Sequence, residues 1–175
     1  MAGDERLRLF LALRLPDDVV AGIGAWQERE LRGRLVPPGN LHVTLAFLGP
    51  RPARALPAIL DALARAARDA EPAPLDVTGY RETRSVGMLT LRDGTGAATR
   101  LAERLHADLA ALGVYRPEAR PWLPHVTVLR FRERPQLRPE TPELRWVSSD
   151  AAALLSRLHP SGALYEVLES FGLGG

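Results

Sequence analysis

The sequence carries one short pattern twice, and this repetition constrains the fold more than any other feature. Residues 41–45 read Leu-His-Val-Thr-Leu, and residues 124–128 read Pro-His-Val-Thr-Val. Each copy lies in an apolar run that is typical of a buried strand. In an extended strand, residues i and i+2 point to the same face, about 7 Å apart. Each histidine is therefore predicted to share a face with the threonine two positions later.

The repeat predicts one polar face made by both copies. Two such strands side by side would present His42, Thr44, His125 and Thr127 to one small anion. A single His-x-Thr pattern is most often a structural pair, but two copies about half a chain apart favour two similar half-domains that share a site. The alternating apolar positions are predicted to face the core: Val43, Leu45 and Phe47 in the first copy, Val126 and Val128 in the second.

The composition excludes several kinds of chemistry. The chain has 175 residues, no cysteine, and 23 basic side chains, all of them arginine. Without cysteine, disulfides, thiolate metal sites and a thiol nucleophile are impossible. Without lysine, a lysine-linked adenylate, a Schiff base and a Walker-A phosphate loop are impossible. The net charge of +2 permits an anionic partner but is not that of a protein that coats nucleic acid.

The same features indicate a cytoplasmic protein without a membrane partner. No apolar run approaches the roughly 18 residues that a membrane span needs. The opening residues, Met-Ala-Gly-Asp-Glu-Arg, are charged and do not resemble a signal peptide. The absence of cysteine fits a reducing compartment. We expect residues 1–175 to form one monomeric domain of two interleaved lobes.

Hydrophobic periodicity predicts an α+β fold. Helices are expected over residues 16–32, 53–70 and 97–112. Several neighbouring strands are joined too briefly for parallel crossovers, so we expect antiparallel sheets with outer helices in two pseudo-equivalent lobes. The strands are expected over residues 6–15, 40–48, 75–84, 86–92, 124–131, 149–158 and 163–169, with an exposed loop over 132–143.

The repeated motif suggests acid/base chemistry on a phosphodiester. Two histidines can act as general base and general acid in one step. Thr44 and Thr127 could then donate hydrogen bonds to the non-bridging phosphate oxygens, where charge builds in the transition state. This set has no carboxylate or third imidazole nearby, so we expect no metal and no cofactor. The remaining histidines, His106 on a helix flank and His159 in a turn, are predicted to be structural.

The chain resembles the 2H phosphoesterase superfamily and, within it, the RNA 2′,3′-cyclic phosphodiesterases, also called the 2′-5′ RNA ligase family. The resemblance rests on residues 9–13, 40–49, 122–130 and 155–165, which hold the opening strand, both motifs and the closing segment. It implies a bilobal, pseudo-twofold fold in which two antiparallel sheets with outer helices surround a central cleft. One departure is Val128, where leucine is more usual in the family.

The resemblance also implies an activity and roles. The implied reaction is hydrolysis of the terminal 2′,3′-cyclic phosphate of an RNA or oligonucleotide to a 2′-phosphate. His42 would be the proton donor and His125 the proton acceptor. Arg130 would bind substrate, although strict alternation places it on the opposite face from His125. It could reach the phosphate only past a strand end or a bulge, and otherwise it is a solvated charge.

Other interpretations remain open. Within the superfamily the activity could be 2′-5′ RNA ligation, hydrolysis of 2′-5′ linkages or hydrolysis of another cyclic nucleotide. In a different class, the chain could be an RNA- or nucleotide-binding module without turnover, although intact histidines in both copies argue against it. Four aromatic residues could stack a nucleobase, but the pattern favours a core or rim position for each of them: Phe10, Trp26, Tyr115 and Trp122.

Overall fold

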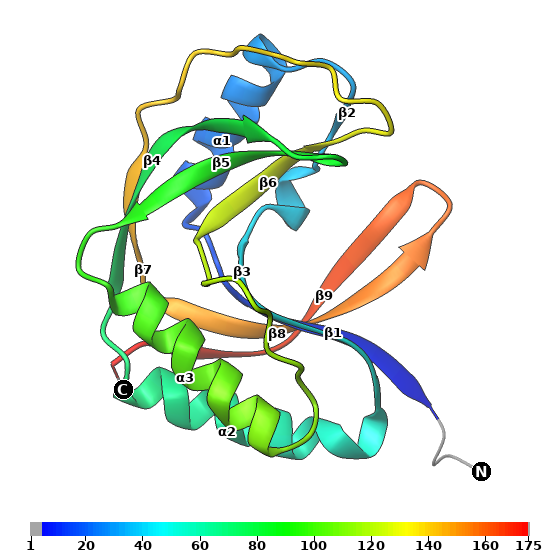
Figure 1. Cartoon of the computed structure of the whole chain (residues 1–175), viewed down its shortest axis with the longest axis vertical. Coiled ribbons are helices and arrows are strands. Elements are labelled where there is room, and N and C mark those ends of the chain that lie inside the picture. The colour runs from blue at the N-terminus through cyan, green and yellow to red at the C-terminus, as the bar shows by residue number, and fades with distance from the viewer. Residues whose placement is uncertain (1–4, 175) are drawn as a thin grey trace.

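The structure is a computed structural model that describes residues 5–174, and it confirms the predicted α+β class (Figure 1). The long elements follow the predicted order. The elements are β1 (Arg6–Leu13), α1 (Asp17–Glu30), β2 (Arg34–Leu35), η2 (Pro38–Asn40), β3 (Val43–Pro52), η3 (Ala53–Ala55), α2 (Leu56–Asp69), β4 (Ala73–Glu82), β5 (Val86–Asp93), α3 (Ala97–Ala111), β6 (His125–Arg130), β7 (Arg145–Ser148), β8 (Asp150–His159) and β9 (Gly162–Gly172).

The strands of residues 5–174 form one curled antiparallel sheet of nine strands. Eight of them run in the order β7-β4-β5-β6-β3-β1-β8-β9, and β2 pairs with β6. The two predicted sheets are the two halves of this sheet. The halves meet where β3 pairs with β6, and the pairing there is a single residue pair, Val43 with Val126. The strands diverge on either side of this pair.

The helices cross between the two halves. α1 follows β1 in the chain, yet it packs on the β4-β5-β6 half, where the rings of Trp26 and Tyr80 lie 6.1 Å apart. α3 follows β5 but packs against α2 and β3 beneath the other half (Figure 1). No helix between residues 5 and 174 combines the length and apolar composition that a membrane crossing requires.

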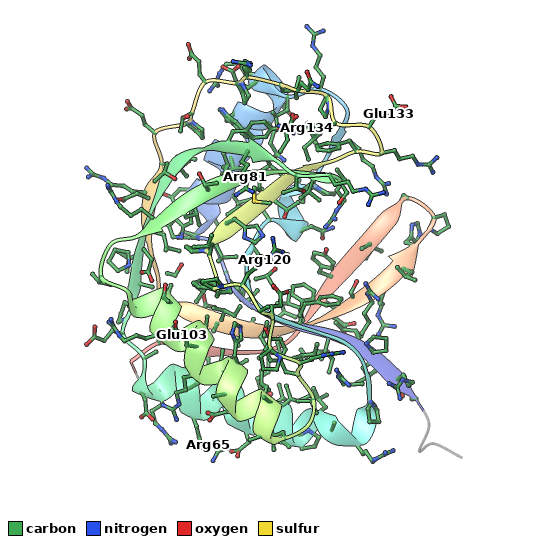
Figure 2. The ribbon with its side chains drawn as sticks, in the orientation of Figure 1. Arg65, Arg81, Glu103, Arg120, Glu133 and Arg134 are labelled. Atoms are coloured by element: carbon green, nitrogen blue, oxygen red, sulfur yellow. The ribbon has the colours of Figure 1, made fainter. Side chains whose placement is uncertain are left out.

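The core and the surface follow the expected patterns. α2 buries one stripe at helical spacing, and β1 buries Leu9, Leu11 and Leu13 against the helices. The opposite face of β1 carries Phe10 and Ala12, which belong to a smaller apolar cluster with β8. Charged side chains such as Arg65 and Glu103 point to solvent (Figure 2).

Two short strands were not predicted. β2 has only two residues, and β7 has four, so neither is long enough to show a period-2 pattern in sequence. The predicted exposed loop over 132–143 is free of helices and strands, but it is held at one point by a buried acid.

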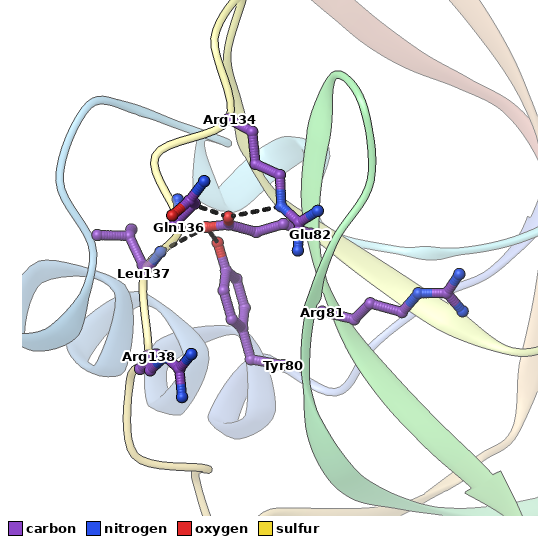
Figure 3. A pocket seen from close by; sticks show the side chains of 7 residues that line it. All are labelled: Tyr80, Arg81, Glu82, Arg134, Gln136, Leu137 and Arg138. Carbon is purple, nitrogen blue, oxygen red and sulfur yellow. Dashed lines mark hydrogen bonds and ion pairs between the residues drawn. The ribbon is translucent and has the colours of Figure 1, made fainter.

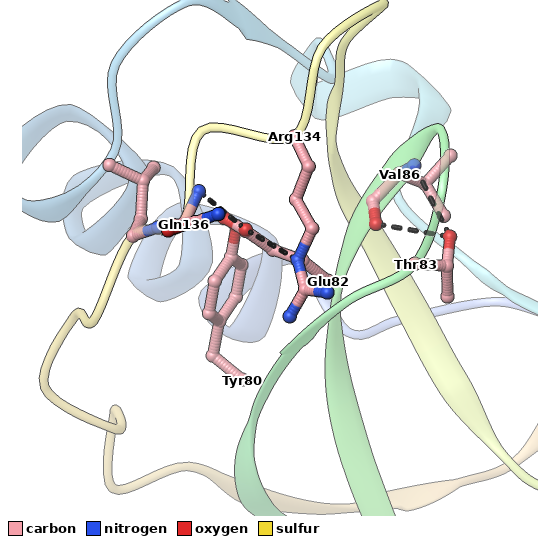
Figure 4. Close-up of polar contacts among 7 residues, drawn as sticks. Tyr80, Glu82, Thr83, Val86, Arg134 and Gln136 are labelled. Carbon is pink, nitrogen blue, oxygen red and sulfur yellow. Dashed lines mark hydrogen bonds and ion pairs between the residues drawn. The ribbon is translucent and has the colours of Figure 1, made fainter.

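That acid is Glu82, which is only 8% exposed at the end of β4. Its carboxylate accepts hydrogen bonds from the Tyr80 hydroxyl at 2.7 Å, the Gln136 N–H at 2.8 Å and the Leu137 N–H at 3.0 Å. Arg134 Nε lies 3.4 Å away (Figures 3 and 4). Burial alone would raise the pKa of Glu82, but these donors hold it below its usual value. The ionised carboxylate therefore anchors the loop to the sheet.

Candidate active site

The central pair of strands brings the two His-x-Thr motifs together. His42 immediately precedes β3, and His125 begins β6. Extending the Val43–Val126 pairing by one residue each way places His42 opposite Thr127 and His125 opposite Thr44. Diagonal neighbours in such a pair lie about 7–8 Å apart. The valines between are fully buried, whereas all four motif residues are only partly buried, so these four share the open face.

Both strands contain a bulge at the same place after the threonine. The register of β3 with β1 skips Leu45, and the register of β6 with β5 skips Val128. Each skipped residue is the third after its histidine. A bulge shifts the alternation by one, so the fifth residue after each histidine returns to the face of that histidine. These two residues are Phe47 and Arg130.

The bulges change two sequence-based placements. Phe47 was predicted to face the core, and this is wrong, because its side chain is 51% exposed and lines a cavity beside the histidines. Arg130 required a bulge to reach the same face as His125, and the bulge is present. Arg130 lines the same cavity as Phe47.

Each bulge is stabilised by a side chain from a helix. The Leu45 carbonyl accepts a hydrogen bond from His106 Nε2 of α3 at 2.7 Å. The Val128 carbonyl accepts one from Gln27 Nε2 of α1 at 2.9 Å and one from the Val36 N–H at 3.0 Å. His106 is thus structural, as predicted. It satisfies a carbonyl that the irregular ladder leaves without a regular partner.

The cavity beside the motifs has a volume of about 400 Å³. Its walls come from β1, β3, β6 and the β8–β9 hairpin, so both halves of the sheet contribute. The polar residues of the lining are Arg8, Asn40, His42, Thr44, Thr127, Arg130 and Ser156, and the aromatic ones are Phe10, Phe47 and Tyr165. An anion in this cavity would meet hydroxyls, an imidazole and guanidinium groups.

His42 packs against two neighbouring aromatic rings and is held at both nitrogens by hydrogen bonds. Its ring centroid lies 4.9 Å from that of Phe10 and 5.5 Å from that of Tyr165. Nδ1 lies 2.8 Å from the Asn40 carbonyl oxygen, and Nε2 lies 2.8 Å from Thr44 Oγ1. A carbonyl can only accept, so Nδ1 carries a proton. In the neutral ring, Nε2 therefore accepts from the Thr44 hydroxyl.

This environment keeps the free imidazole neutral. Burial lowers the pKa of His42 to about 4, and the nearby charges of His125 and Arg130 act in the same direction. The hydrogen bond to the Asn40 carbonyl favours the charged form but does not offset the burial.

His125 repeats the arrangement of His42 with a more open ring. Its Nδ1 lies 3.0 Å from the carbonyl oxygen of Leu123, two residues earlier, as His42 Nδ1 does with Asn40. Nδ1 is again the protonated nitrogen. Among residues 5–174 its Nε2 has no hydrogen-bond partner, so the Nε2 lone pair is free to accept a proton.

The four aromatic residues suggested for base stacking do not form an open platform. Phe10 and Trp26 are buried, at 3% and 1% exposure. Tyr115 stacks on His106, and Trp122 donates its indole N–H to the Thr44 carbonyl at 3.0 Å. The open ring in the cavity belongs to Phe47, which sequence reasoning missed because the bulge has no clear sequence signal.

Phe47 is accompanied by a cation. The guanidinium carbon of Arg8 lies 5.0 Å from the centroid of the Phe47 ring.

Among the described residues, no cluster of three or more histidine, aspartate or glutamate side chains has the geometry to hold a metal ion. The site as described offers two imidazoles, two hydroxyls, guanidinium groups and one exposed ring.

Comparison with known proteins assigns this architecture to a family. The profile of the 2′-5′ RNA ligase superfamily matches residues 15–159. The chain is 36% identical to the RNA 2′,3′-cyclic phosphodiesterase of Thermus thermophilus over 181 aligned residues, covering 97% of this chain and 91% of that protein.

Solved structures agree. The crystal structure of TT0787 of Thermus thermophilus has a TM-score of 0.85 at 34% identity, covering 97% of this chain and 99% of that one. That of Escherichia coli LigT complexed with 3′-AMP has a TM-score of 0.84 at 26% identity, covering 98% and 100%. The paired motifs, the curled sheet and these matches agree, and the chain belongs to the 2′-5′ RNA ligase superfamily.

Proposed function

We propose that this protein hydrolyses the terminal 2′,3′-cyclic phosphate of RNA to a 2′-phosphate. The observation that carries the proposal is the placement of two His-x-Thr motifs on one face of paired strands, beside a cavity that both halves line. The Thermus relative is named an RNA 2′,3′-cyclic phosphodiesterase, and the Escherichia coli LigT structure holds 3′-AMP, a ribonucleotide with its phosphate on the ribose.

The cavity suggests one orientation for the substrate. β3 and β6 are antiparallel, so Phe47 and Arg130 lie toward opposite ends of the motif pair. We place the cyclic phosphate between Thr44 and Thr127, within reach of the Arg130 guanidinium. The nucleobase would then stack at the other end on Phe47 and Arg8, since aromatic rings and guanidinium planes both stack on bases.

The reaction needs one proton removed and one supplied. His125 Nε2 would accept a proton from the attacking water as its oxygen bonds to phosphorus. The P–O3′ bond breaks, and His42 Nε2–H would give its proton to O3′, leaving the phosphate on O2′. Non-bridging oxygens gain charge in the transition state, where Thr127 and Arg130 would stabilise it.

The low pKa of His42 fits the donor role only if substrate raises it. At about 4 it leaves the free ring neutral at neutral pH. A phosphodiester anion about 4 Å away stabilises the imidazolium by roughly 4 kcal/mol at an effective dielectric constant of about 20. That would raise the pKa of His42 by about 3. The substrate charge would therefore create the acid that its own cleavage requires.

Protonation of His42 would also redirect Thr44. In the neutral state, the Thr44 hydroxyl donates to Nε2 across 2.8 Å. Once Nε2 carries a proton, it no longer accepts from the hydroxyl. The Thr44 hydroxyl is then free to donate to a phosphate oxygen. Protonation of His42 would thus create the general acid and free the Thr44 hydroxyl to bind phosphate at the same time.

The test is the turnover of an oligonucleotide ending in a 2′,3′-cyclic phosphate, with the product identified as a 2′- or 3′-phosphate. His42→Ala and His125→Ala should each remove most activity, and the double variant should be little worse, because the two groups act in one step. Activity should persist in excess chelator. Exclusive 3′-phosphate product, or a divalent ion requirement, would contradict the mechanism.

The alternatives predict other outcomes. A ligase would join the cyclic-phosphate end to a strand with a free 5′-hydroxyl. A binding module would retain the oligonucleotide unchanged. Either result with the wild-type protein, in the absence of hydrolysis, would replace the proposed function.

A further inference from the structure

Two arginines face each other across the short β2–β6 ladder. Arg34 of β2 pairs directly with Arg130 of β6, so their side chains share a face. Like charges placed directly opposite each other repel. Within residues 5–174, neither arginine forms an ion pair with an acidic side chain. The two exposed arginines therefore offer a pair of positive charges to an anion that lies between them.

The Arg34 side chain reaches across to the β8–β9 hairpin, which projects from the body of the molecule (Figure 1). Its Nη2 lies 3.2 Å from where a Cβ on Gly162 would stand, at the hairpin turn. Gly162 has φ of +125°, a conformation that favours glycine. The hairpin is held in place by Asn40, whose Nδ2 donates to the Ala163 carbonyl at 2.8 Å.

Arg34 thereby closes one side of a small second hollow. Its volume is about 100 Å³, and Arg34, Arg130 and the turn residue Ser161 line it. The second hollow and the active-site cavity share lining residues, among them Arg130 and Tyr165. Together they extend from Phe47 past His42 to Arg34.

We propose that this second hollow binds the phosphodiester that precedes the terminal nucleotide, so that the protein selects an RNA chain over a mononucleotide. This rests on the proposed function. On a ribose, the base at C1′ and the 5′-linked chain at C4′ lie on the same face of the ring but diverge from the two carbons that flank the ring oxygen. With the base on Phe47, the 5′ chain would therefore leave toward Arg34. Two guanidinium groups and a hydroxyl match the oxygens of a phosphodiester.

The test compares two substrates, uridine 2′,3′-cyclic phosphate and a trinucleotide ending in the same group. The measured quantity is the ratio of kcat/KM for the trinucleotide to that for the mononucleotide. Wild type should favour the trinucleotide, and Arg34→Gln should lower the ratio about tenfold, as expected for one charge-assisted contact. Arg32→Gln removes the same charge two residues away, at an exposed position outside both hollows, and should leave the ratio unchanged.

A second measurement does not require turnover. A labelled trinucleotide ending in a 2′-phosphate should bind Arg34→Gln more weakly than wild type. The slope of log affinity against log salt should fall by about 0.7, the value for one phosphate contact of a single strand. The thermal midpoint of this variant should equal or exceed that of wild type, because the substitution removes a like-charge pair. A lower midpoint would assign Arg34 a structural role.

The outcomes separate the two proposals. If wild type hydrolyses neither substrate, the proposed function fails, whatever the binding data show. If wild type hydrolyses both substrates without preferring the trinucleotide, the function stands and the second phosphate site is refuted. The same conclusion follows if Arg34→Gln lowers kcat/KM equally for both substrates. An unchanged salt slope in Arg34→Gln would refute that site as well.

Discussion

His42→Asn should make the stability of the protein less sensitive to acid. The unfolded chain should titrate this histidine near its reference pKa of about 6.5, whereas in the folded state burial lowers the pKa of His42 to about 4. Between these values the unfolded state binds more protons at this site. Stability therefore falls as the pH falls through this window, and the full contribution is present only above about pH 6.5.

The magnitude follows from the two pKa values. From about pH 7.5 to about pH 5, the linkage at His42 alone should cost about 2 kcal/mol of folding stability, and the full loss below pH 4 should be about 3 kcal/mol. An asparagine cannot take up this proton. The variant should therefore lose about 2 kcal/mol less than wild type over the same interval, even if it is less stable at every pH.

Urea unfolding at a series of pH values measures this difference directly. The other titrating groups are common to both proteins, so they cancel in the comparison of pH slopes. His159→Asn is the matched control, because His159 is an exposed histidine at the β8–β9 turn with a local hydrogen bond to Ser161. Parallel stability curves for wild type and His42→Asn would refute the buried, neutral state of His42 in the free protein.

Four further predictions follow from the same contacts. The pKa of His42 read from the pH profile of kcat/KM, which reports the free protein, should be about 4, whereas the value read from kcat, which reports the substrate complex, should be higher because bound phosphate stabilises the imidazolium; the same pKa in both profiles would exclude this effect. Glu82→Ala should cost about 3 kcal/mol in urea unfolding, since it leaves buried donors without an acceptor, and a loss below about 1 kcal/mol would show that the loop is held elsewhere. Gly87→Ala should cost about 1–3 kcal/mol in the same assay, because a Cβ there overlaps the Tyr80 ring, and a neutral result would show that Tyr80 moves freely. His106→Ala should lose about 1 kcal/mol of stability, and His106→Gln should recover most of it, because Gln27 donates to the equivalent carbonyl of β6; equal losses in the two variants would show that the His106 hydrogen bond does not stabilise the bulge at Leu45.

Much of the fold could be predicted from periodicity alone. The helices at 56–69 and 97–111 and the long strands have strong 3.6- and 2-residue patterns, and all lie where they were expected. The repeat of His-x-Thr also placed His42 and His125 beside each other, because it fixed which residues share a face. β2 and β7 were missed because two and four residues are too few to show a 2-residue pattern.

The rest of the site depends on the bulges. The backbone carbonyls that the bulges leave unpaired accept hydrogen bonds from α1 and α3, which are far away in the chain. The sequence of β3 alone therefore does not reveal its bulge, and regular alternation along it placed Phe47 in the core. The same alternation could not decide whether the Arg130 side chain lies in the cleft or in solvent. Glu82 went unnoticed for a similar reason, since three of its partners belong to a loop without pattern.

The crossing of the helices and the position of β1 inside the sheet both join segments that are far apart in the chain, and this has a consequence for synthesis on the ribosome. β1 lies between β3 and β8, so one edge of this early strand stays open until residues 150–159 have been made. The bulge of β3 likewise waits for His106, and that of β6 can close only after a helix made about a hundred residues earlier has docked. A nascent chain that stops short of β8 should present an unpaired strand edge, which is a hazard for aggregation. Both motifs therefore acquire their final shape only after β6 has been made and α1 and α3 have docked.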